Sequence, residues 1–94
     1  MRRQGFTSDT NEWSDDERLR RLIIDHIEND ETFLIRGELT TLIVVEVYEG
    51  YATLSGLVRS DAERRRADML ARALGALGVH NRLHLEADVS RRRA

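Results

Sequence analysis

Three histidines, one run of acidic residues and scattered hydroxyl side chains are the groups in this sequence that could do chemistry. His80 and His84 lie four residues apart in a strand-like segment, and at about 3.3 Å per residue they are roughly 13 Å apart, too far to share one metal ion. The run Asp15-Asp16-Glu17 suits the first turn of a helix, where carboxylates favour the positive end of the helix dipole. The sequence contains no cysteine, G-x-S-x-G turn or G-x-x-x-x-G-K-[ST] phosphate loop. These patterns predict a protein that is not an enzyme and that has no metal or cofactor.

One short motif is of the kind that binds nucleic acid. Gly75-Ala76-Leu77-Gly78 reads G-x-x-G, the loop with which a KH domain clamps a nucleic-acid backbone. In a KH domain this loop joins two helices, whereas here a strand is expected from Val79, and the loop itself contains no Lys or Arg. The net charge of −2 also argues against a large basic surface. KH-like binding is therefore only a minor alternative, and nucleic acid is not an expected partner.

Length and composition indicate one folded domain. A chain of 94 residues with 40% hydrophobic and 34% charged residues does not have the composition of a disordered protein. The longest uncharged central stretch, Leu39–Val45, is far short of the ~20 residues that span a bilayer, and no apolar secretory segment follows Met1. We expect a cytoplasmic protein with a mobile leader over residues 1–13, a domain over 14–89 and a basic tail over 90–94.

The first helix is predicted by its start signal and its apolar spacing. Ser14 and Glu17 form a capping box, in which each side chain accepts a hydrogen bond from the backbone amide of the other residue. Apolar positions then recur at three- and four-residue spacing and form one stripe: Leu19, Leu22, Ile23, His26 and Ile27. We predict a helix over residues 15–28 or 15–29, with His26 at the core edge as a packing or capping residue.

A β-hairpin follows in the middle of the chain. The strand-like runs Thr41–Tyr48 and Tyr51–Arg59 are joined by Glu49-Gly50, a two-residue loop suited to a primed turn. This turn sets the register with Tyr48 opposite Tyr51, and both strands then agree on which alternate positions are apolar. The predicted core-facing set is Ile43, Val45, Val47, Ala52, Leu54 and Val58.

A second helix and a third strand complete the pattern. Ser60 and Glu63 form another capping box, and the helix is expected to end at Gly75. Its core stripe is Ala67, Leu70, Ala71 and Leu74. The segment from Val79 to about Val89 alternates as a strand, which has either of the first two strands as its partner. The order α-β-β-α-β predicts an α+β two-layer sandwich, with two helices packed on one face of a three-stranded sheet.

The string V-x-V-Y-E-G-x-x-x-L-S-G-x-V-R-S, followed by E-R, A-x-x-x-A and V-x-N-x-L-x-L, resembles the BON domain of bacterial osmotic-shock and nodulation proteins. The resemblance covers about residues 15–87 in a single copy. The matching positions are Val45, Val47, Gly50, Leu54, Gly56, Val58, Ser60, Arg64, Ala67, Ala71, Gly75, Val79, Asn81, Leu83 and Leu85. Ala76 departs from the family, which usually has Val there. The resemblance implies the α-β-β-α-β fold and a non-catalytic module, in a family that is mostly exported and that associates with phospholipid membranes or envelope proteins.

Four of these family positions also have a structural interpretation. Gly50 supplies the positive φ of the hairpin turn, and Gly75 ends the second helix. Gly56 lets a helix or a neighbouring strand approach closely, or marks a bulge. Asn81 points to the core side of its strand. We expect it to hydrogen-bond a loop backbone, such as that after the first helix, because buried amides find local partners.

Two classes of binding function fit these residues. The first is implied by the BON resemblance: Trp13, Arg18 and Arg21 contact a phospholipid surface, with the aromatic ring at headgroup depth and the guanidinium groups toward phosphate. Trp13 has the alternative role of a hydrophobic staple at the start of the first helix.

In the second class, the uncovered face of the sheet binds a partner protein or a second copy of the chain. An antiparallel sheet with one wet face is normally polar there, so an apolar patch on that face indicates a partner site. The candidate partner surface is Leu42, Val44, Tyr48, Tyr51, Leu57, His80, Arg82 and His84. The alternative is that residues 1–13 or the Phe33–Ile35 connection folds back over this face.

Overall fold

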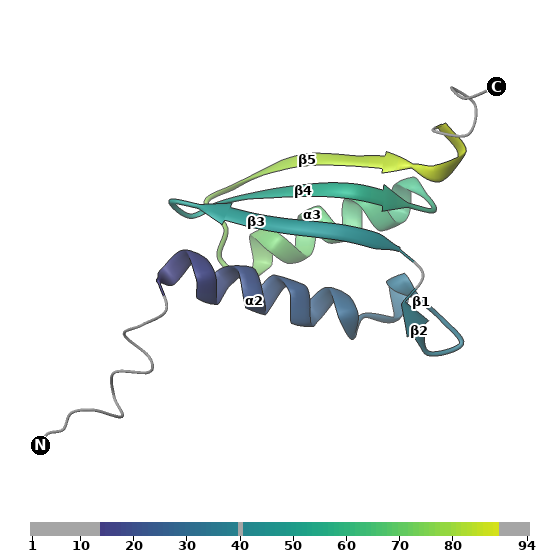
Figure 1. Cartoon of the computed structure of the whole chain (residues 1–94), viewed down its shortest axis with the longest axis horizontal. Coiled ribbons are helices and arrows are strands. Elements are labelled where there is room, and N and C mark those ends of the chain that lie inside the picture. The colour runs from purple at the N-terminus through teal and green to yellow at the C-terminus, as the bar shows by residue number, and fades with distance from the viewer. Residues whose placement is uncertain (1–13, 40, 89–94) are drawn as a thin grey trace, which may run out of the picture.

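A computed structural model describes residues 14–39 and 41–88, so the expected leader and basic tail lie outside the described residues. Two helices and a three-stranded sheet form the domain, with a short hairpin beside them (Figure 1). The elements are α2 (Asp15–Glu28), the 3-10 helix η1 (Glu31–Phe33), β1 (Leu34–Ile35), β2 (Glu38–Leu39), β3 (Leu42–Tyr48), β4 (Tyr51–Val58), α3 (Asp61–Ala73) and β5 (Gly78–Leu85). The predicted α+β class is confirmed, whereas η1 and the β1–β2 pair are not indicated by the sequence.

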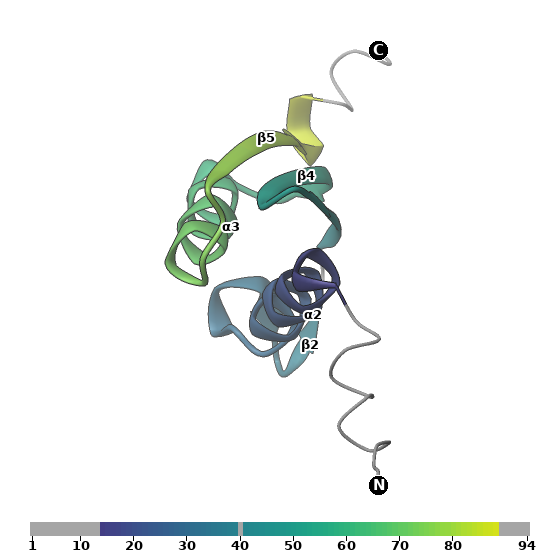
Figure 2. The same cartoon turned by 90° about the vertical axis from the view of Figure 1, so that its left-hand side faces the viewer.

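The sheet has the order β3-β4-β5, with β4 in the centre. β3 and β4 pair antiparallel in the predicted register, from Leu42 opposite Leu57 to Tyr48 opposite Tyr51. β5 pairs with β4 in parallel, so the partner of the third strand is the second strand. Figure 2, turned by 90° from Figure 1, shows α2 and α3 on the same side of the sheet. The opposite side, which neither helix covers, is called the open face below.

The β3–β4 turn is held by the first turn of α2. Glu49 and Gly50 both have positive φ, 51° and 87°, as one type of two-residue primed turn requires. The Asp16 carboxylate accepts a hydrogen bond from each of these residues, at 2.7 Å from Glu49 N and 2.9 Å from Gly50 N. Asp16 therefore ties the start of α2 to the tip of the hairpin, in addition to complementing the helix dipole.

The core lies between the helices and the inner face of the sheet. Its buried members are Ile23, Ile27, Phe33, Val45, Ala52, Leu54, Val58, Ala67, Ala71 and Leu83. The predicted stripe of α2 is wrong at two positions, because Leu22 is 41% exposed and His26 is exposed. The helix turns the side that carries Ile23 and Ile27 toward the core, so that Ile24 packs there instead. The His26 ring remains on its own helix, with Nδ1 2.9 Å from Leu22 O.

Both predicted capping serines are in place. Ser14 Oγ accepts from Glu17 N at 3.1 Å, and Ser60 Oγ accepts from Glu63 N at 3.3 Å. The acidic half of the second box differs from the prediction, because the buried Glu63 carboxylate accepts from Arg59 N at 2.7 Å and pairs with the Arg59 guanidinium. The start of α3 is thus fixed by the neutral hydrogen bond between Ser60 and Glu63 N and by the charged contact between the Glu63 carboxylate and Arg59.

The third strand is shorter than its alternating pattern predicts. Gly75 follows the end of α3 with a φ of 124°, in agreement with its expected role at the helix end, although the last helical residue is already Ala73. β5 ends at Leu85, which lies beside Val58, the last residue of β4. Residues 86–88 form a helical turn, because no residue of β4 remains for them to pair with.

Gly56 is required by the close approach of the neighbouring strand. It lies opposite Ile43 with a φ of 118°, which side-chain-bearing residues rarely adopt. A Cβ atom at this position would overlap the carbonyl oxygen of Leu42 on β3. The sequence is compatible with close approach of a helix, close approach of a strand, or a bulge at this glycine. The structure shows that the neighbouring strand β3 approaches Gly56 closely.

An ion pair connects the segment after α2 to α3. Arg66 donates from Nε and Nη2 to Asp30 Oδ2, at 3.0 and 2.8 Å, and Thr32 N donates to Asp30 Oδ1 at 2.8 Å. Burial by itself raises the pKa of the Asp30 carboxyl, but the hydrogen bonds from Arg66 and Thr32 outweigh burial and hold this pKa below its ordinary value. The folded state therefore favours the ionised form of Asp30.

Leu54→Ala should lower the free energy of unfolding by roughly 2–5 kcal/mol, because Leu54 is completely buried and its truncation leaves a cavity. The matched control is Leu42→Ala, at a position that is 66% exposed, which should cost less than about 1 kcal/mol. Urea unfolding measures both values. A loss below about 0.5 kcal/mol for Leu54→Ala would contradict this packing.

Arg66→Met retains the side-chain stem but removes the charge beside Asp30, and should lower the free energy of unfolding at pH 7 by about 1–2 kcal/mol. Because the folded-state pKa of Asp30 is depressed, this stabilisation is complete above the unfolded-chain pKa of about 3.9 and is lost as the pH falls through the folded pKa. The difference between wild type and Arg66→Met should therefore shrink as the pH is lowered from about 5 toward 2.

The control is Arg65→Met, since Arg65 is 75% exposed and pairs with Asp61 on the surface of α3. Its effect should be within about 0.5 kcal/mol at both ends of the pH range. An Arg66→Met effect that stays constant over the whole range would show that Asp30 is not the titrating partner.

Candidate functional site

The open face gathers the eight residues of the candidate partner surface on three adjacent strands. Four large apolar side chains on it are exposed to water: Leu42 by 66%, Val44 by 48%, Tyr48 by 75% and Tyr51 by 50%. Leu57 belongs to the same face but is only partly exposed, because it lies in the central strand between Leu42 and His84. The eight residues therefore lie on one face, as their alternation in the sequence predicts, and Leu57 is the least accessible of them.

The side chains of the open face change in character from one edge of the sheet to the other. Four rows cross the strands: Leu42–Leu57–His84, Val44–Ser55–Arg82, Glu46–Thr53–His80 and Tyr48–Tyr51–Gly78. β3 carries an apolar strip that Glu46 interrupts, the middle of β4 carries hydroxyl groups, and β5 carries the basic side chains. Within residues 14–39 and 41–88, no ion pair engages Arg82. The face is thus apolar on one side and carries one arginine and two histidines on the other.

Both edges of the sheet are occupied by polar side chains. At the β3 edge, Arg20 of α2 donates from Nε to Val45 O at 3.0 Å. Its Nη1 donates to the Glu17 carboxylate at 3.1 Å, which is a correction to the predicted bond between that carboxylate and the Ser14 amide. At the β5 edge, Asn81 Oδ1 accepts from Leu83 N at 3.2 Å. At each edge a side chain thus engages one backbone group, which makes that part of the edge less suited to pairing with another strand.

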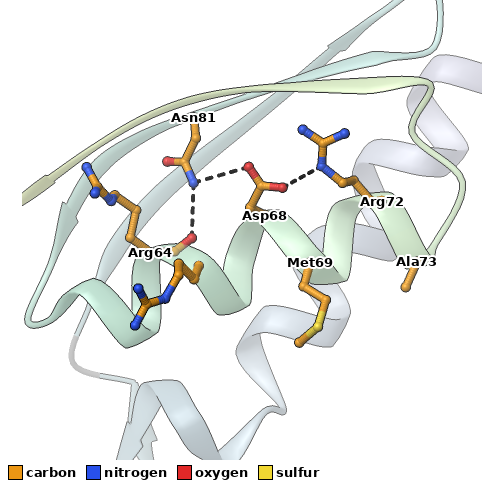
Figure 3. Close-up of a pocket in the computed structure, with 7 residues that line it drawn as sticks. Arg64, Asp68, Met69, Arg72, Ala73 and Asn81 are labelled. Carbon is orange, nitrogen blue, oxygen red and sulfur yellow. Dashed lines mark hydrogen bonds and ion pairs between the residues drawn. The ribbon is translucent and has the colours of Figure 1, made fainter.

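Asn81 also connects β5 to α3. Its Nδ2 donates to Arg64 O at 3.0 Å and lies 3.5 Å from Asp68 Oδ2 (Figure 3). Asn81 does bond to a backbone group, but the prediction of a loop backbone, such as that after the first helix, is wrong, because Arg64 lies within α3. Asn81 is in the outer strand beside α3, so the nearest carbonyl group belongs to that helix.

A hollow of about 770 Å³ lies over α3 beside β5, and Figure 3 shows the side chains that line it. Its polar groups are already paired with one another or with the helix. Arg72 Nε donates to Asp68 at 2.6 Å, and Arg64 and Arg65 both pair with Asp61 at 2.7 Å. Met69 points away from Asn81 (Figure 3). These side chains do not converge on a common point, so we assign no ligand site to the hollow.

The predicted membrane contact is only partly within the described residues, because Trp13 lies outside them. Arg18 and Arg21 are exposed on α2, and Arg18 donates to Asp15 at 2.5 Å. α2 lies on the side of the sheet opposite the open face (Figure 2). Arg18 and Arg21 therefore form a surface separate from the open face. Among the described residues, no helix has the length and apolar character needed to cross a membrane.

The G-x-x-G motif is used inside the fold. Gly75 follows the end of α3, Leu77 N donates to Gly50 O at 2.8 Å, and Gly78 begins β5 close to the Tyr51 ring. The loop therefore connects α3, the hairpin tip and β5. For metal binding, the part of the chain that the structure describes contains no cluster of three His, Asp or Glu side chains suited to an ion.

The contacts of Arg20 and Asp16 with the hairpin are not identified by sequence analysis. The spacing of Arg20 from Ile23 does place it on the packed side of α2, which is a signal that it contacts the sheet. No comparable signal exists for Asp16, because its partners are backbone amides far along the chain.

Asn81→Ala should lower the free energy of unfolding by roughly 1–2 kcal/mol, because Arg64 O and Leu83 N each lose a hydrogen-bond partner. For the same reason, hydrogen exchange at the Leu83 amide should become faster. The matched control is Asn29→Ala, which removes an exposed bond from Asn29 Nδ2 to Asp25 O. This control should leave exchange at Leu83 unchanged. If exchange at Leu83 is equally fast in wild type and Asn81→Ala, Asn81 does not close this edge.

Comparison with known families agrees with the resemblance seen in the sequence. The family model of the BON domain matches residues 15–87, a range that contains both helices and the three-stranded sheet. Among curated proteins, none matches the chain. The two helices, the glycine-containing hairpin turn and the Asn81 contact all lie within the matched residues, and the chain belongs to the BON domain family.

Proposed function

We propose that this BON domain is a non-catalytic binding module that holds a partner protein against its open face. The observation that carries the proposal is the group of exposed apolar side chains Leu42, Val44, Tyr48 and Tyr51 on a face that neither helix covers. Burial of apolar surface lowers the free energy by roughly 25 cal/mol per Å² removed from water. Contiguous exposed apolar patches therefore mark interaction sites. The family match supports a binding module in general.

The other surfaces of the domain are less suited to a partner. Strand addition needs free N–H and C=O groups along an edge, and Arg20 and Asn81 occupy Val45 O and Leu83 N at the two edges. The Phe33–Ile35 connection does not cover the open face, because Phe33 is completely buried in the core on the helix side. Within the described residues, the open face is thus the surface that a partner can cover with the least rearrangement.

Phospholipid association, which the BON resemblance implies, is the competing function. Its candidate residues on α2 lie beside the acidic run Asp15-Asp16-Glu17, and Arg18 is already paired with Asp15. Negative charge at this position opposes binding to an anionic lipid surface. These contacts favour a protein partner at the open face over a lipid surface at α2.

Site-specific photo-cross-linking in cells of the source organism tests the proposal. A benzophenone amino acid at Tyr48 or Leu42 should give a discrete protein adduct, whereas the same group at Met69, an exposed apolar position on α3, should not. Mass spectrometry of the adduct distinguishes a different protein from a second copy of this chain. Adducts that are absent at Tyr48 and Leu42, or equally strong at Met69, would contradict a partner site on the open face.

Liposome co-sedimentation tests the competing function. With vesicles of anionic phospholipid at low ionic strength, we expect little binding and no change on Trp13→Ala. Binding that Trp13→Ala abolishes would instead support the lipid contact at the start of α2.

A further inference from the structure

We propose that the open face recognises one amphipathic helix of a partner protein, whose apolar stripe lies along β3 and whose acidic flank lies along β5. This inference rests on the proposed function and adds the chemistry of the occupant. It is carried by the division of the face into an apolar strip (Leu42, Val44 and Tyr48) and a strip of basic residues (His80, Arg82 and His84). Arg82 is the only one of these residues with a permanent charge, and it is exposed.

The dimensions of the face match a single helix. Neighbouring strands lie about 4.8 Å apart, so β3 and β5 are separated by roughly 10 Å, which is the diameter of an α-helix with its side chains. The seven residues of β3 and eight of β5 extend for about 25 Å at 3.3 Å per residue, the length of a helix of about 17 residues. One helix therefore touches both strips at once, with its two flanks in different chemical surroundings.

The small side chains in the middle of the face support this geometry. Thr53 and Ser55 lie between the two strips on β4. Their side chains are smaller than those of Val44 and Arg82 in the neighbouring strands, whereas Tyr51 and Leu57 at the two ends of β4 are large. Glu46 on β3 adds a further requirement, because a partner that covers it must offer a hydrogen-bond donor or a basic residue there.

A second copy of the open face does not provide this chemistry. Two such faces can pack about a two-fold axis that places β3 of one copy on β3 of the other. In that arrangement β5 also meets β5, so the Arg82 side chain of each copy comes near the basic residues of the other. If the two-fold axis instead runs parallel to the strands, the apolar strip of each copy meets the strip of basic residues of the other. The first arrangement brings like charges together. The second brings Glu46 of each copy near basic residues of β5, but it also lays Leu42, Val44 and Tyr48 against those polar groups. A helix with an apolar stripe and an acidic flank places apolar groups on the apolar strip and carboxylates beside Arg82.

Charge reversal at Arg82 tests the inference in the full chain. Arg82→Glu should reduce the Tyr48 photo-adduct at least about tenfold, because an attractive charge contact becomes repulsive. Arg65→Glu is the matched control, since it makes the same change in net charge at an exposed position on α3, and it should leave the adduct unchanged. Arg82→Gln, which only removes the charge, should give an intermediate loss, and the backbone amide spectrum verifies that each variant is folded.

A pair of designed helical peptides tests the chemistry directly. Both have about 17 residues and the same Leu stripe, and they differ only in a Glu or a Lys flank. The Glu peptide should shift the amide resonances of β3, β4 and β5 and bind at least about tenfold more tightly than the Lys peptide. Arg82→Glu should reverse this preference, and Arg65→Glu should not.

The results separate the inference from the proposed function. A Tyr48 adduct that Arg82→Glu leaves unchanged, or peptides that bind without preference or not at all, would overturn the acidic helix while the partner site on the open face stands. If wild type gives no adduct at Tyr48, both fail. Binding to phosphatidylglycerol vesicles that Arg82→Glu abolishes, without an effect of the Glu peptide, would show that the face meets a lipid surface and would overturn the inference.

Discussion

The register of the β3–β4 hairpin is the constraint on which the rest of the domain depends. Side chains alternate along a strand, so a shift of β3 by one residue would turn Leu42 and Tyr48 toward the core and Val45 to the outside. The positive φ angles of Glu49 and Gly50 allow the tight turn that prevents this shift, and Asp16 binds both turn amides. Two helices then cover one face, and the identity of the residues left on the other face follows from the turn.

Closure of the sheet edges is the second constraint on binding. A three-stranded sheet has two edges, and each presents backbone groups that could pair with another chain. Arg20 reaches one edge from α2, and Asn81 joins the other edge to α3. The helices therefore contribute polar side chains to the sheet as well as apolar packing. As a result, one backbone group at each edge already has a side-chain partner.

The helical side and the open face differ in how their charges are satisfied. Most arginines of α2 and α3 pair with acids, and several of these pairs join residues three or four apart, as in Arg18–Asp15 and Arg72–Asp68. Such pairs contribute little to stability but satisfy both charges locally. Arg21 on α2 has no ion pair among the described residues. On the open face Arg82 has no such partner among the described residues, and it lies near exposed apolar groups. Membership of the BON family is consistent with a binding module in general.

Most of the fold could be predicted because its signals are local. The capping serines, the apolar spacing of the helices, the two-residue turn and the alternation of Val45, Leu54 and their neighbours depend on residues close together in the chain. They determine the elements, the hairpin register and the composition of the open face. The same signals mislead at Leu22 and His26, because periodicity alone does not show which side of an apolar stripe meets the sheet.

The contacts between distant segments follow from the packing of the chain and not from local sequence signals. Periodicity determines that β5 is a strand, but the path of the chain after α3 determines that β5 lies beside β4 and ends where β4 ends. The partners of Asp16, Arg20 and Asn81 are backbone groups, and every residue except proline has both a donor and an acceptor there. Sequence therefore identifies which side chains need a partner, and the packing of helices on the sheet selects the backbone group that comes within reach.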